Sequence, residues 1–518
     1  MIRSILVIRL GSLGDVILTS STVLNLKLAH PSARITYLTK DRFADLARVI
    51  PGVDEVRTLP DKTSAVRLYQ LILTLDNQRF DLIVDLHGNM RSWIIRTLVA
   101  APTKVNYPKR RFERWLIVNR KQLPTSWPHT IDIYNHAVSV LGYATPSGRP
   151  VFRAHLAPTR DNTVIIAPGA AHPNKQWSME RFAGVAQALQ HELGVKIISV
   201  VTGADAGKIL LSRSPRGSFF ELVDEPLSVV SEAMASARLT IANDSGLAHL
   251  SSAVGTPVLA VFGPTHPSLG FSPRGLFDEI IQVNEYCRPC SLHGKKRCSR
   301  SEQFCFTRIG IRDVVDAAQR ILARKLNTHR ALLLDRDGTV IEDRNYGSDP
   351  DQIQLIPGAG SALRKAQESG FKLVTVSNQS GVARGYFGTD AVEATNNRVR
   401  TLLAAQGVHL DLMLFCPHHR EGSVPEYSVD CSCRKPSPGM AERVAKELNV
   451  DLRRSFVIGD KVDDMALGMI AGCTPFLVRT GYGKQSEEML RSSSLFRRIE
   501  VDDDLAGAIE DILGQRAR

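Results

Sequence analysis

Four short motifs between residues 335 and 464 contain side chains that could transfer a phosphoryl group. They are Asp335-Arg336-Asp337-Gly338-Thr339, Ser377-Asn378-Gln379-Ser380, Arg434-Lys435-Pro436 and Gly459-Asp460-Lys461. One carboxylate can act as a covalent nucleophile and others can hold Mg²⁺, while a hydroxyl and a lysine neutralise phosphoryl oxygens. These residue types predict a metal-dependent phosphatase that works through an aspartyl-phosphate.

Three of these motifs directly follow apolar runs typical of buried parallel strands, at residues 331–334, 373–376 and 455–458. Ligands of such sheets bind outside the carboxyl ends of the strands. We therefore expect the motifs to meet in one crevice.

Three cysteines and a histidine late in the chain form a second chemical signal. Cys416 and His418 are followed, after a loop of 12 residues, by Cys431 and Cys433. Thiolates and imidazole are the ligands that zinc prefers, and thiols rarely cluster for packing alone in a reducing compartment. We expect structural zinc at these four residues.

A second group of cysteines lies in the loop 286–306, at Cys287, Cys290, Cys298 and Cys305. The first two form a CxxC pair, but the later two do not. A bound metal, a redox pair and free thiols all remain open for this loop.

Length and composition indicate a multidomain globular protein. The chain has 518 residues, 43% of them hydrophobic and 23% charged, which predicts about three domains. No apolar stretch approaches the roughly 20 residues of a membrane span. The N-terminal residues lead directly into a predicted strand at 5–8 and lack the layout of a signal peptide. We expect a cytoplasmic protein without a transmembrane segment.

The net charge of +12 favours anionic partners, and the densest basic segment is residues 104–121. Tyr107, Phe112 and Trp115 are interleaved with its cations, as in surfaces that bind nucleic acid or anionic lipid. The alternative is a solvated helix whose aromatic rings face the core. Because no nucleic-acid-binding motif accompanies the segment, we expect a phosphorylated lipid or sugar and no nucleic acid.

Strand and helix patterns alternate along the whole chain, which predicts an α/β protein with mostly parallel sheets. We expect strands at residues 5–10, 35–38 and 82–86, then at 164–167, 196–201, 239–243 and 258–262. The predicted domains are 1–150, 151–326 and 331–518, the first two being Rossmann-like.

Several polar residues of the first two predicted domains follow strands. Asp15 comes after Gly11-Ser12-Leu13-Gly14, at a helix start where it could cap the helix or act chemically. In the second domain, Lys175 and the helix start at Asp244-Ser245-Gly246 could bind a nucleotide diphosphate through charge and backbone N–H groups.

These residues lie in motifs that resemble the family 9 glycosyltransferases, the ADP-heptose:lipopolysaccharide heptosyltransferases. The matching segments are Arg9–Asp15, Asp85–Asn89, Lys175–Trp177, Asn243–His249 and Gly263–Thr265. The resemblance implies a glycosyltransferase B fold of two Rossmann-like domains that uses no metal. It also implies that Asp15 is the general base and places five residues around ADP, namely Lys175, Asp244, Ser245, Gly246 and His249.

Residues 331 to about 485 resemble the haloacid dehalogenase phosphatases, and more closely the D-glycero-D-manno-heptose-1,7-bisphosphate 7-phosphatases. The matches are the four phosphoryl-transfer motifs, Gly381–Gly385 and the two cysteine motifs. The histidinol-phosphate phosphatases share this architecture. The resemblance implies a Rossmannoid haloacid dehalogenase-like domain.

The expected mechanism assigns a role to each phosphatase residue. Asp335 attacks phosphorus, and Asp337 protonates the leaving oxygen and then activates water. Ser377 and Lys435 neutralise the phosphoryl oxygens. The predicted Mg²⁺ ligands are the Asp335 carboxylate, the Asp337 carbonyl and Asp460, with Asp463 and Asp464 behind them or at the helix start. The predicted substrate-binding residues are Asp343, Tyr346, Asn378, Gln379, Ser380 and Arg434.

Both resemblances point to heptose, which favours a bifunctional enzyme of lipopolysaccharide synthesis. Its expected partners are heptose bisphosphate, ADP-heptose and a lipopolysaccharide core acceptor at the inner face of the cytoplasmic membrane. The alternative is a histidinol-phosphate-type or other sugar phosphatase joined to a module that only binds a nucleotide sugar. Asp15 and Lys175 are both present, which favours two activities.

Overall fold

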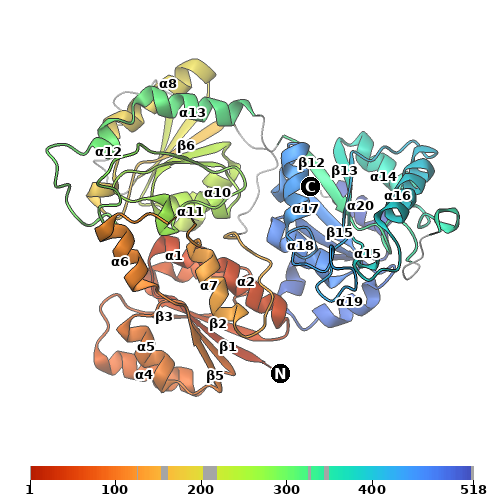
Figure 1. Ribbon diagram of the computed structural model, residues 1–518, viewed down its shortest axis with the longest axis horizontal. Coiled ribbons are helices and arrows are strands. Elements are labelled where there is room, and N and C mark those ends of the chain that lie inside the picture. The colour runs from red at the N-terminus through yellow and green to blue at the C-terminus, as the bar shows by residue number, and fades with distance from the viewer. Residues whose placement is uncertain are drawn as a thin grey trace. The chain divides into compact units, whose positions relative to one another are not determined.

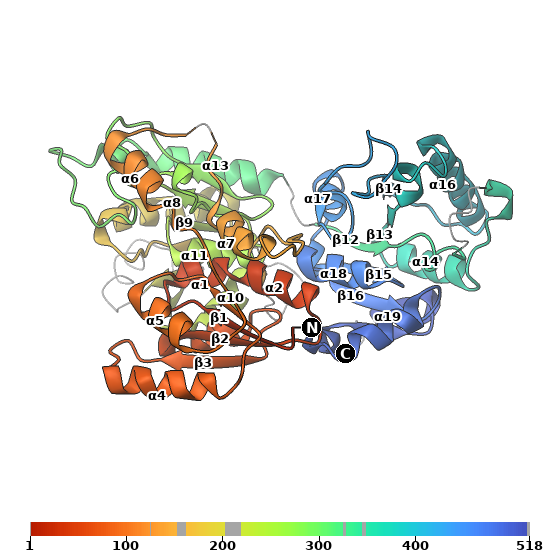
Figure 2. The same ribbon diagram turned by 60° about the horizontal axis from the view of Figure 1, so that its bottom comes forward.

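The computed structural model describes residues 2–124, 126–152, 162–201, 219–324, 328–343 and 349–514. It divides into two compact units, Met1–Arg324 and Lys325–Arg518. The first unit contains two parallel sheets and the second contains one (Figures 1 and 2). No helix among the described residues is long and apolar enough to cross a membrane.

The first sheet has the order β3-β2-β1-β4-β5, and all neighbours are parallel. Its strands are β1 (Ser4–Ile8), β2 (Arg34–Lys40), β3 (Glu55–Leu59), β4 (Leu82–Asp85) and β5 (Thr103–Asn106). Its helices are α1 (Leu13–Leu18), α2 (Ser20–Ala29), α3 (Ala44–Arg48), α4 (Ala65–Asp76), α5 (Met90–Leu98), α6 (Arg111–Arg120) and α7 (Thr130–Ser139). Apolar residues of α4 and α5 pack on one face of the sheet, and those of α1, α2, α3 and α7 pack on the other.

The second sheet has the order β11-β10-β9-β6-β7-β8 and is also parallel. Its strands are β6 (Thr163–Ala167), β7 (Lys196–Val201), β8 (Phe219–Val223), β9 (Leu239–Asn243), β10 (Val258–Val261) and β11 (Glu279–Ile281). The helices are α8 (Met179–Leu193), α10 (Leu227–Ser236), α11 (Gly246–Ala253), α12 (Phe304–Thr307) and α13 (Ile311–Ala323). Helices α8 and α13 lie side by side on one face (Figure 1).

The sheet of the second unit has the order β14-β13-β12-β15-β16-β17. Its strands are β12 (Arg330–Leu334), β13 (Phe371–Asn378), β14 (Leu412–Cys416), β15 (Phe456–Gly459), β16 (Thr474–Val478) and β17 (Glu500–Asp502). The helices are α14 (Ala359–Glu368), α15 (Ser380–Ala383), α16 (Thr389–Ala404), α17 (Gly439–Glu447), α18 (Val462–Ala471), α19 (Gly483–Leu490) and α20 (Leu505–Gly514). Apolar residues of α14, α16 and α20 fill one face of this sheet.

In each of the three sheets the strand order reverses beside the first strand of the sheet. The reversal lies between β1 and β4, between β6 and β9, and between β12 and β15. Such a switch point leaves a crevice at the carboxyl ends of the strands, where α/β proteins bind ligands. The predicted functional segments follow β1, β6, β9, β12 and β15, so the topology alone brings them to these crevices.

The segment just before the predicted domain boundary at residue 150 is packed against the first domain. The buried backbone carbonyl of Ser147 accepts hydrogen bonds from Asn25 (3.0 Å) and Asn135 (2.8 Å). The Ser147 N–H in turn donates to Asn25 at 2.9 Å. Because the first two sheets belong to one compact unit, their division into domains 1–150 and 151–326 stays a prediction.

Candidate active sites and metal centre

Asp335 lies at the end of β12 and is almost fully buried. Lys435 donates a hydrogen bond from Nζ to Asp335 Oδ1 at 2.8 Å, and the same ammonium lies 2.5 Å from Asp464 Oδ1. Burial works to raise the pKa of Asp335, but the charges of Lys435 and Lys461 hold it below the usual value. The predicted nucleophile is therefore an ionised carboxylate fixed by the predicted phosphate-binding lysine.

Asn378 holds this lysine in place through its backbone. Its amide donates to the Lys435 carbonyl at 3.0 Å, and its carbonyl oxygen accepts from the Lys435 N–H at 2.9 Å. A residue predicted to bind substrate thus contacts the backbone of a catalytic residue.

The side chain of Asp337 is held by three neighbours. Gln379 donates from Nε2 to Asp337 Oδ2 at 2.8 Å, and the Ser377 hydroxyl lies 3.4 Å from the same oxygen. The buried Arg336 guanidinium pairs with Asp337 at 3.1 Å and donates to Asn396 of α16 at 2.9 Å. These contacts fix the orientation of the predicted acid and base.

Lys461 Nζ marks the point where the predicted Mg²⁺ ligands converge. It lies 3.4 Å from the Asp337 carbonyl oxygen, 3.5 Å from Asp335 Oδ2 and 3.5 Å from Asp460 Oδ1. Hard oxygen donors around one positive atom are the chemistry that Mg²⁺ prefers. The residues present therefore fit the predicted metal.

Glycine is required close to this point. Gly338 has a φ of +86°, and a Cβ built on it would lie 2.4 Å from Asp460 Oδ2. A side chain would thus be strained and would also collide with a predicted ligand. This explains the glycine within the first motif.

Asp464 is both the helix start that was predicted and a member of the acidic cluster. It is the third residue of α18, and its Oδ2 accepts a hydrogen bond from the Lys461 N–H at 3.1 Å. Asp335, Asp460 and Asp464 offer oxygens that lie within 4.8 Å of one another. Burial, with the nearby charge of Asp335 opposed by Lys435, raises the pKa of Asp464 to about 7.

The predicted catalytic residues Asp335, Asp337, Ser377 and Lys435 line a cavity of about 290 Å³. The predicted Mg²⁺ ligand Asp460 is fully buried and does not line it. Among the described residues, six carboxylates and four cations line it, together with Ser377, Asn378, Gln379 and Ser380. Asp343 lies on this wall, 3.5 Å from Lys461 Nζ, and Arg434 lines it too. Tyr346 lies outside the described residues.

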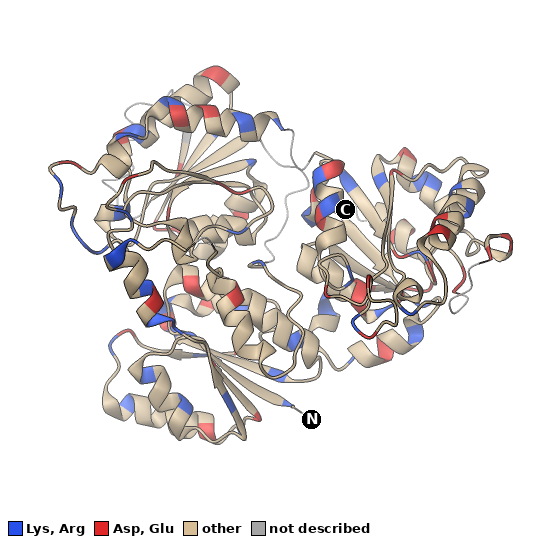
Figure 3. Ribbon diagram, viewed as in Figure 1, with Lys and Arg blue, Asp and Glu red and all other residues tan. Residues whose placement is uncertain are grey.

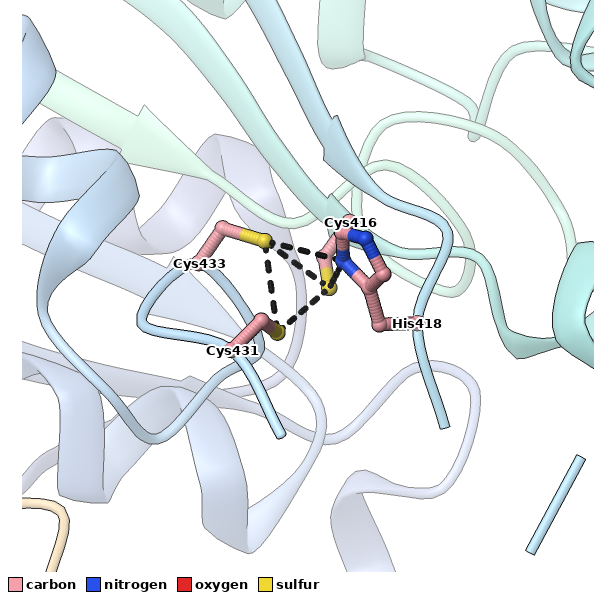
Figure 4. Close-up of side chains that lie close together, drawn as sticks. All are labelled: Cys416, His418, Cys431 and Cys433. Atoms are coloured by element: carbon pink, nitrogen blue, oxygen red, sulfur yellow. Dashed lines mark hydrogen bonds between the residues drawn. The ribbon is translucent and has the colours of Figure 1, made fainter. Parts of the chain in front are cut away.

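The four predicted zinc ligands lie together at the end of β14 (Figure 4). Five separations among the three sulfurs and His418 Nδ1 are 3.2 to 3.5 Å. Tetrahedral ligands with zinc–sulfur bonds of about 2.3 Å would lie roughly 3.8 Å apart. The hydrogen bond between Cys416 and Cys433 lowers the pKa of Cys433 to about 5 and raises the pKa of Cys416, so it favours a thiolate at Cys433, the form that a metal binds.

This cluster is tied to the phosphatase cavity by Arg434. Its guanidinium donates to the His418 carbonyl oxygen at 3.0 Å, and its N–H donates to Cys431 Sγ at 3.3 Å. The cysteine cluster therefore supports the loop that carries Arg434 and Lys435.

The earlier cysteine loop differs from this cluster. Among the described residues, two groups of three or more metal-ligand side chains come together, and neither includes Cys287, Cys290, Cys298 or Cys305. Cys305 is buried on α12, while Cys290 donates to the Cys287 carbonyl at 3.4 Å. A metal at this loop is not favoured by the geometry.

In the first unit, Asp15 is the third residue of α1 and follows the end of β1. Ser12 rather than Asp15 is the N-cap residue, and its hydroxyl donates to Asp15 Oδ2 at 3.0 Å. Tyr134 of α7 donates to the other carboxylate oxygen at 3.0 Å, and Arg9 forms an ion pair with Asp15. The carboxylate thus has a capping role and also faces a cavity.

The electrostatics of Asp15 keep it ionised. Burial works to raise its pKa, but the charge of Arg9 and the hydrogen bonds from Tyr134 and Ser12 outweigh burial and lower it. Asp15 is therefore available as a proton acceptor at neutral pH once one of these partners yields to a substrate hydroxyl.

The predicted diphosphate residues meet at the ends of β6 and β9. Lys175 Nζ lies 2.6 Å from Asp244 Oδ2, which also accepts a hydrogen bond from the Thr265 hydroxyl at 2.6 Å. Asn243 joins the two strand ends because it donates to the Pro168 carbonyl at 2.5 Å and accepts from the Trp177 N–H at 3.0 Å.

The helices that follow β1 and β9 approach each other closely. A Cβ on Gly246 would lie 2.7 Å from the Leu13 side chain, and a Cβ on Gly14 would lie 2.7 Å from His249 Cδ2. Ser245 is the N-cap of α11, and its hydroxyl is buried without a hydrogen-bond partner among the described residues. Burial lowers the pKa of His249 to about 4, so its ring is neutral.

Asp15, Lys175, Asp244, Ser245, Gly246 and His249 all line one cavity of about 1200 Å³. Ten lysines and arginines and two aspartates line it among the described residues. Tyr134 was absent from the sequence-based prediction because nothing local in its helix marks it as a partner of Asp15. This cavity is wide and cationic, as suits a large anionic ligand.

Comparison with known proteins separates the same two units. Residues 68–299 match the family described as Glycosyltransferase family 9 (heptosyltransferase), and residues 432–508 match a HAD-hydrolase-like family. The D-glycero-beta-D-manno-heptose-1,7-bisphosphate 7-phosphatase of Yersinia pestis is 47% identical over 152 residues, 29% of this chain and 81% of the relative. The enzyme of the same description from Escherichia coli K12 is 42% identical over 152 residues, 29% of this chain and 80% of the relative.

The chain belongs to the D-glycero-beta-D-manno-heptose-1,7-bisphosphate 7-phosphatase family. Its first unit has the fold of a glycosyl transferase family 9 structure from Veillonella parvula, with a TM-score of 0.52, 22% identity, and coverage of 62% of this chain and 97% of that chain. The predicted fusion of a family 9 glycosyltransferase with a haloacid dehalogenase-like phosphatase is confirmed.

Proposed function

We propose that the second unit removes the 7-phosphate of D-glycero-D-manno-heptose 1,7-bisphosphate through an aspartyl-phosphate. The observation that carries this proposal is one cavity that holds Asp335 against Lys435 and Asp337 against Ser377. The identity of 47% to a heptose bisphosphate phosphatase supports the choice of sugar.

The residues divide the reaction between them. Asp335 attacks phosphorus, and the bond between phosphorus and the sugar oxygen breaks as Asp337 delivers a proton to that oxygen. Lys435 and Ser377 neutralise the phosphoryl oxygens. Asp337 then accepts a proton from the water that hydrolyses the aspartyl-phosphate, which returns Asp335.

A further cation would be needed in this cavity, because its described residues already include six carboxylates against four cations before an anionic ester enters. The Asp335 carboxylate, the Asp337 carbonyl and Asp460 would hold Mg²⁺. When bound, the ion would supply positive charge that lets an anionic nucleophile approach an anionic substrate. Arg434 remains to bind the second phosphate of the bisphosphate.

We infer that zinc at Cys416, His418, Cys431 and Cys433 is structural. All four ligand positions are filled by protein, which is typical of structural zinc, and catalytic zinc keeps one position open. The hydrogen bonds of Arg434 to this loop support a role in aiming Arg434 and Lys435.

For the first unit we propose inverting transfer of heptose from ADP-heptose to a lipopolysaccharide inner-core acceptor. Asp15 takes the proton of the acceptor hydroxyl as that oxygen attacks the sugar, and ADP leaves. Lys175, Asp244, Ser245, Gly246 and His249 would surround the ADP group, with Lys175 compensating diphosphate charge. The cationic cavity that contains these residues supports this proposal. The acceptor would be presented at the inner face of the cytoplasmic membrane.

Phosphate release and ADP release from purified full-length protein test the two proposals. We expect rapid phosphate release from the heptose bisphosphate, with the remaining phosphate on carbon 1 by ³¹P NMR, and far slower release from histidinol phosphate. A preference for histidinol phosphate would contradict the phosphatase proposal. Absence of ADP release with ADP-heptose and core acceptor would instead leave the first unit as a nucleotide-sugar-binding module.

A further inference from the structure

Helix α6 carries an exposed surface in which aromatic rings are combined with cations. We call it the α6 surface and define it by Arg110, Arg111, Phe112, Trp115, Arg120 and Lys121, all of them exposed. Figure 3 shows that Lys and Arg are frequent along this helix, which Figure 1 labels. The opposite side of α6 is anchored by the buried Arg114 and Ile117.

The two aromatic rings of α6 are exposed, which contradicts the alternative prediction of a solvated helix whose aromatic rings face the core. Phe112 is 68% exposed and Trp115 is 49% exposed, so neither faces the core, whereas Tyr107 is buried. The two rings stack on each other with centroids 6.2 Å apart and an interplanar angle of 14°. Stacked rings that remain in water are typical of a surface that is covered when a partner binds.

The cations of the α6 surface have no acidic partners that would explain them. Among the described residues, none of Arg110, Arg111, Arg120 or Lys121 pairs with a carboxylate, although Glu113 lies on the same helix. The Lys121 ammonium donates to the backbone carbonyls of Val118 and Pro289. The charges of the three arginines are available to an anionic partner.

Exposed apolar residues alone do not distinguish the α6 surface from other helices of the first unit. Helix α4 of the same sheet exposes Val66, Tyr69 and Leu73 to 68%, 58% and 48%. That helix carries Arg67 as its one basic residue, whereas the α6 surface has four. Of these two helices, α6 combines an aromatic pair with concentrated positive charge and α4 does not, so α4 serves as an internal control.

The α6 surface also continues into the cavity of the first unit. Arg111 and Trp115 line that cavity together with Asp15, and so does Met90, which is 78% exposed at the start of α5. A partner that covers α6 would therefore lie at the entrance of the proposed transferase site.

We propose that the α6 surface docks on a bilayer that contains anionic phospholipids. Phe112 and Trp115 would lie among the headgroups, where amphipathic aromatic rings are favoured, while Arg110 and Arg120 would face lipid phosphates. The inference rests on the proposed transferase function, because a lipid-linked acceptor would be delivered to Asp15 along the same surface. Charge complementarity to an anionic bilayer and the amphipathic rings favour lipid over nucleic acid.

Sedimentation of the full chain with vesicles that contain no acceptor tests this docking. We expect binding to vesicles of phosphatidylcholine with phosphatidylglycerol, weaker binding to phosphatidylcholine alone, and loss of binding at high salt. Phe112→Ser should weaken binding roughly tenfold, since a large apolar side chain would be buried on docking. Arg120→Ser should weaken it about fivefold, the effect of one cation near an anionic surface.

Tyr69→Ser and Arg67→Ser on α4 are the matched controls and should bind vesicles like the wild type. An equal loss in the α4 and α6 variants, no binding by the wild type, or equally tight binding to a DNA duplex would each overturn the docking surface. Circular dichroism verifies that each variant is folded.

The same variants separate this inference from the proposed transferase. Phe112 and Arg120 do not line the cavity, so their variants should transfer to a detergent-free, water-soluble acceptor at the wild-type rate. If the wild type transfers no sugar but its vesicle binding depends on Phe112, the docking surface stands and the proposed transferase falls. If the wild type transfers sugar normally but does not bind vesicles, the proposed transferase stands and the docking surface falls.

Discussion

The two candidate sites differ in the charge of the side chains that line them. The phosphatase cavity is about 290 Å³, and the described part of its wall has more carboxylates than cations. The transferase cavity is about 1200 Å³, with ten cations against two aspartates among the described residues that line it. The first must build a compact anionic nucleophile and add a metal, whereas the second must hold an anionic donor that brings its own charge.

The central carboxylates differ accordingly. Asp335 is paired with Lys435, a cation that also neutralises substrate in the proposed reaction, so the pair is part of the chemistry. Asp15 is paired with Arg9 and Tyr134, which restrain it and keep it ionised. The phosphatase site is thus preassembled, whereas in the transferase site the substrate must displace a partner of Asp15.

The strongest test of this comparison is to remove each carboxylate in turn. Asp335→Asn should lower phosphatase turnover by about 10⁴-fold or more, because the covalent nucleophile is lost. Asp15→Ala should lower heptosyl transfer by about 10²- to 10⁴-fold, the usual effect of a general base. Each variant should keep the other activity near normal, since the residues lie in separate compact units.

Steady-state rates of both reactions on both full-length variants give the answer. Loss of both activities in either folded variant would contradict independence of the two sites.

Metal removal should separate the sites further. EDTA followed by Mg²⁺ should restore phosphatase activity, while zinc held by thiolates should survive that treatment. Cys431→Ser should lower zinc content by about one ion per chain and reduce phosphatase turnover at least tenfold, because the Arg434 N–H bonds to this sulfur. Elemental analysis and phosphate release are the measurements.

Cys298→Ser is the matched control for this change, since Cys298 lies outside the clustered ligands. It should alter neither zinc content nor phosphatase rate. Wild-type protein that contains no zinc and turns over normally would show that the cluster has another purpose.

Gln379 offers a smaller and more specific test of the preassembled site. Gln379→Leu removes the amide that holds Asp337, so turnover of the sugar phosphate should fall by about a hundredfold. The first-turnover burst with p-nitrophenyl phosphate should be nearly unchanged, because its leaving group needs no proton. Rapid-quench measurement of nitrophenol distinguishes the two steps.

Asn378→Leu is the neighbouring control. It disturbs the backbone of Lys435, so it should slow both substrates alike. If Gln379→Leu also slows both alike, Gln379 does not act through Asp337.

Much of the fold could be predicted from local patterns, and the exceptions share a cause. Strands in the interior of a sheet, such as β7 (Lys196–Val201) and β9 (Leu239–Asn243), are mainly apolar and largely buried, and the predicted bounds agree with the structure. Edge strands such as β5 (Thr103–Asn106) and β17 (Glu500–Asp502) are short and partly exposed, so no run of apolar residues marks them. Their pairing depends on neighbours distant in sequence.

The site residues also divide into those that local sequence motifs predict and those that depend on contacts distant in sequence. Asp335, Lys435 and the four clustered ligands lie in compact motifs whose residue types indicate their chemistry. The partnership of Tyr134 with Asp15 spans 119 residues, and the contact of Arg336 with Asn396 spans 60. Such contacts follow from packing of α7 and α16 on their sheets, which no local pattern contains.

The smallest expected effect concerns the buried histidine of the transferase cavity. Burial lowers the pKa of His249 from 6.5 to about 4. Between these values the unfolded state binds more protons than the folded state, so stability falls as the pH falls from 6.5 to about 4 and then levels off. The shift corresponds to roughly 3 kcal/mol for the first unit.

All four tryptophans lie in the first unit, at Trp93, Trp115, Trp127 and Trp177, so their fluorescence reports the unfolding of that unit alone. Thermal unfolding should show a midpoint that drops toward pH 4 in the wild type and drops less in His249→Gln, which cannot titrate. His136→Gln, at an exposed position of α7, should follow the wild-type profile. Parallel profiles for wild type and His249→Gln would mean that His249 is not held neutral, and the close packing of α11 against Gly14 would then be looser than the structure shows.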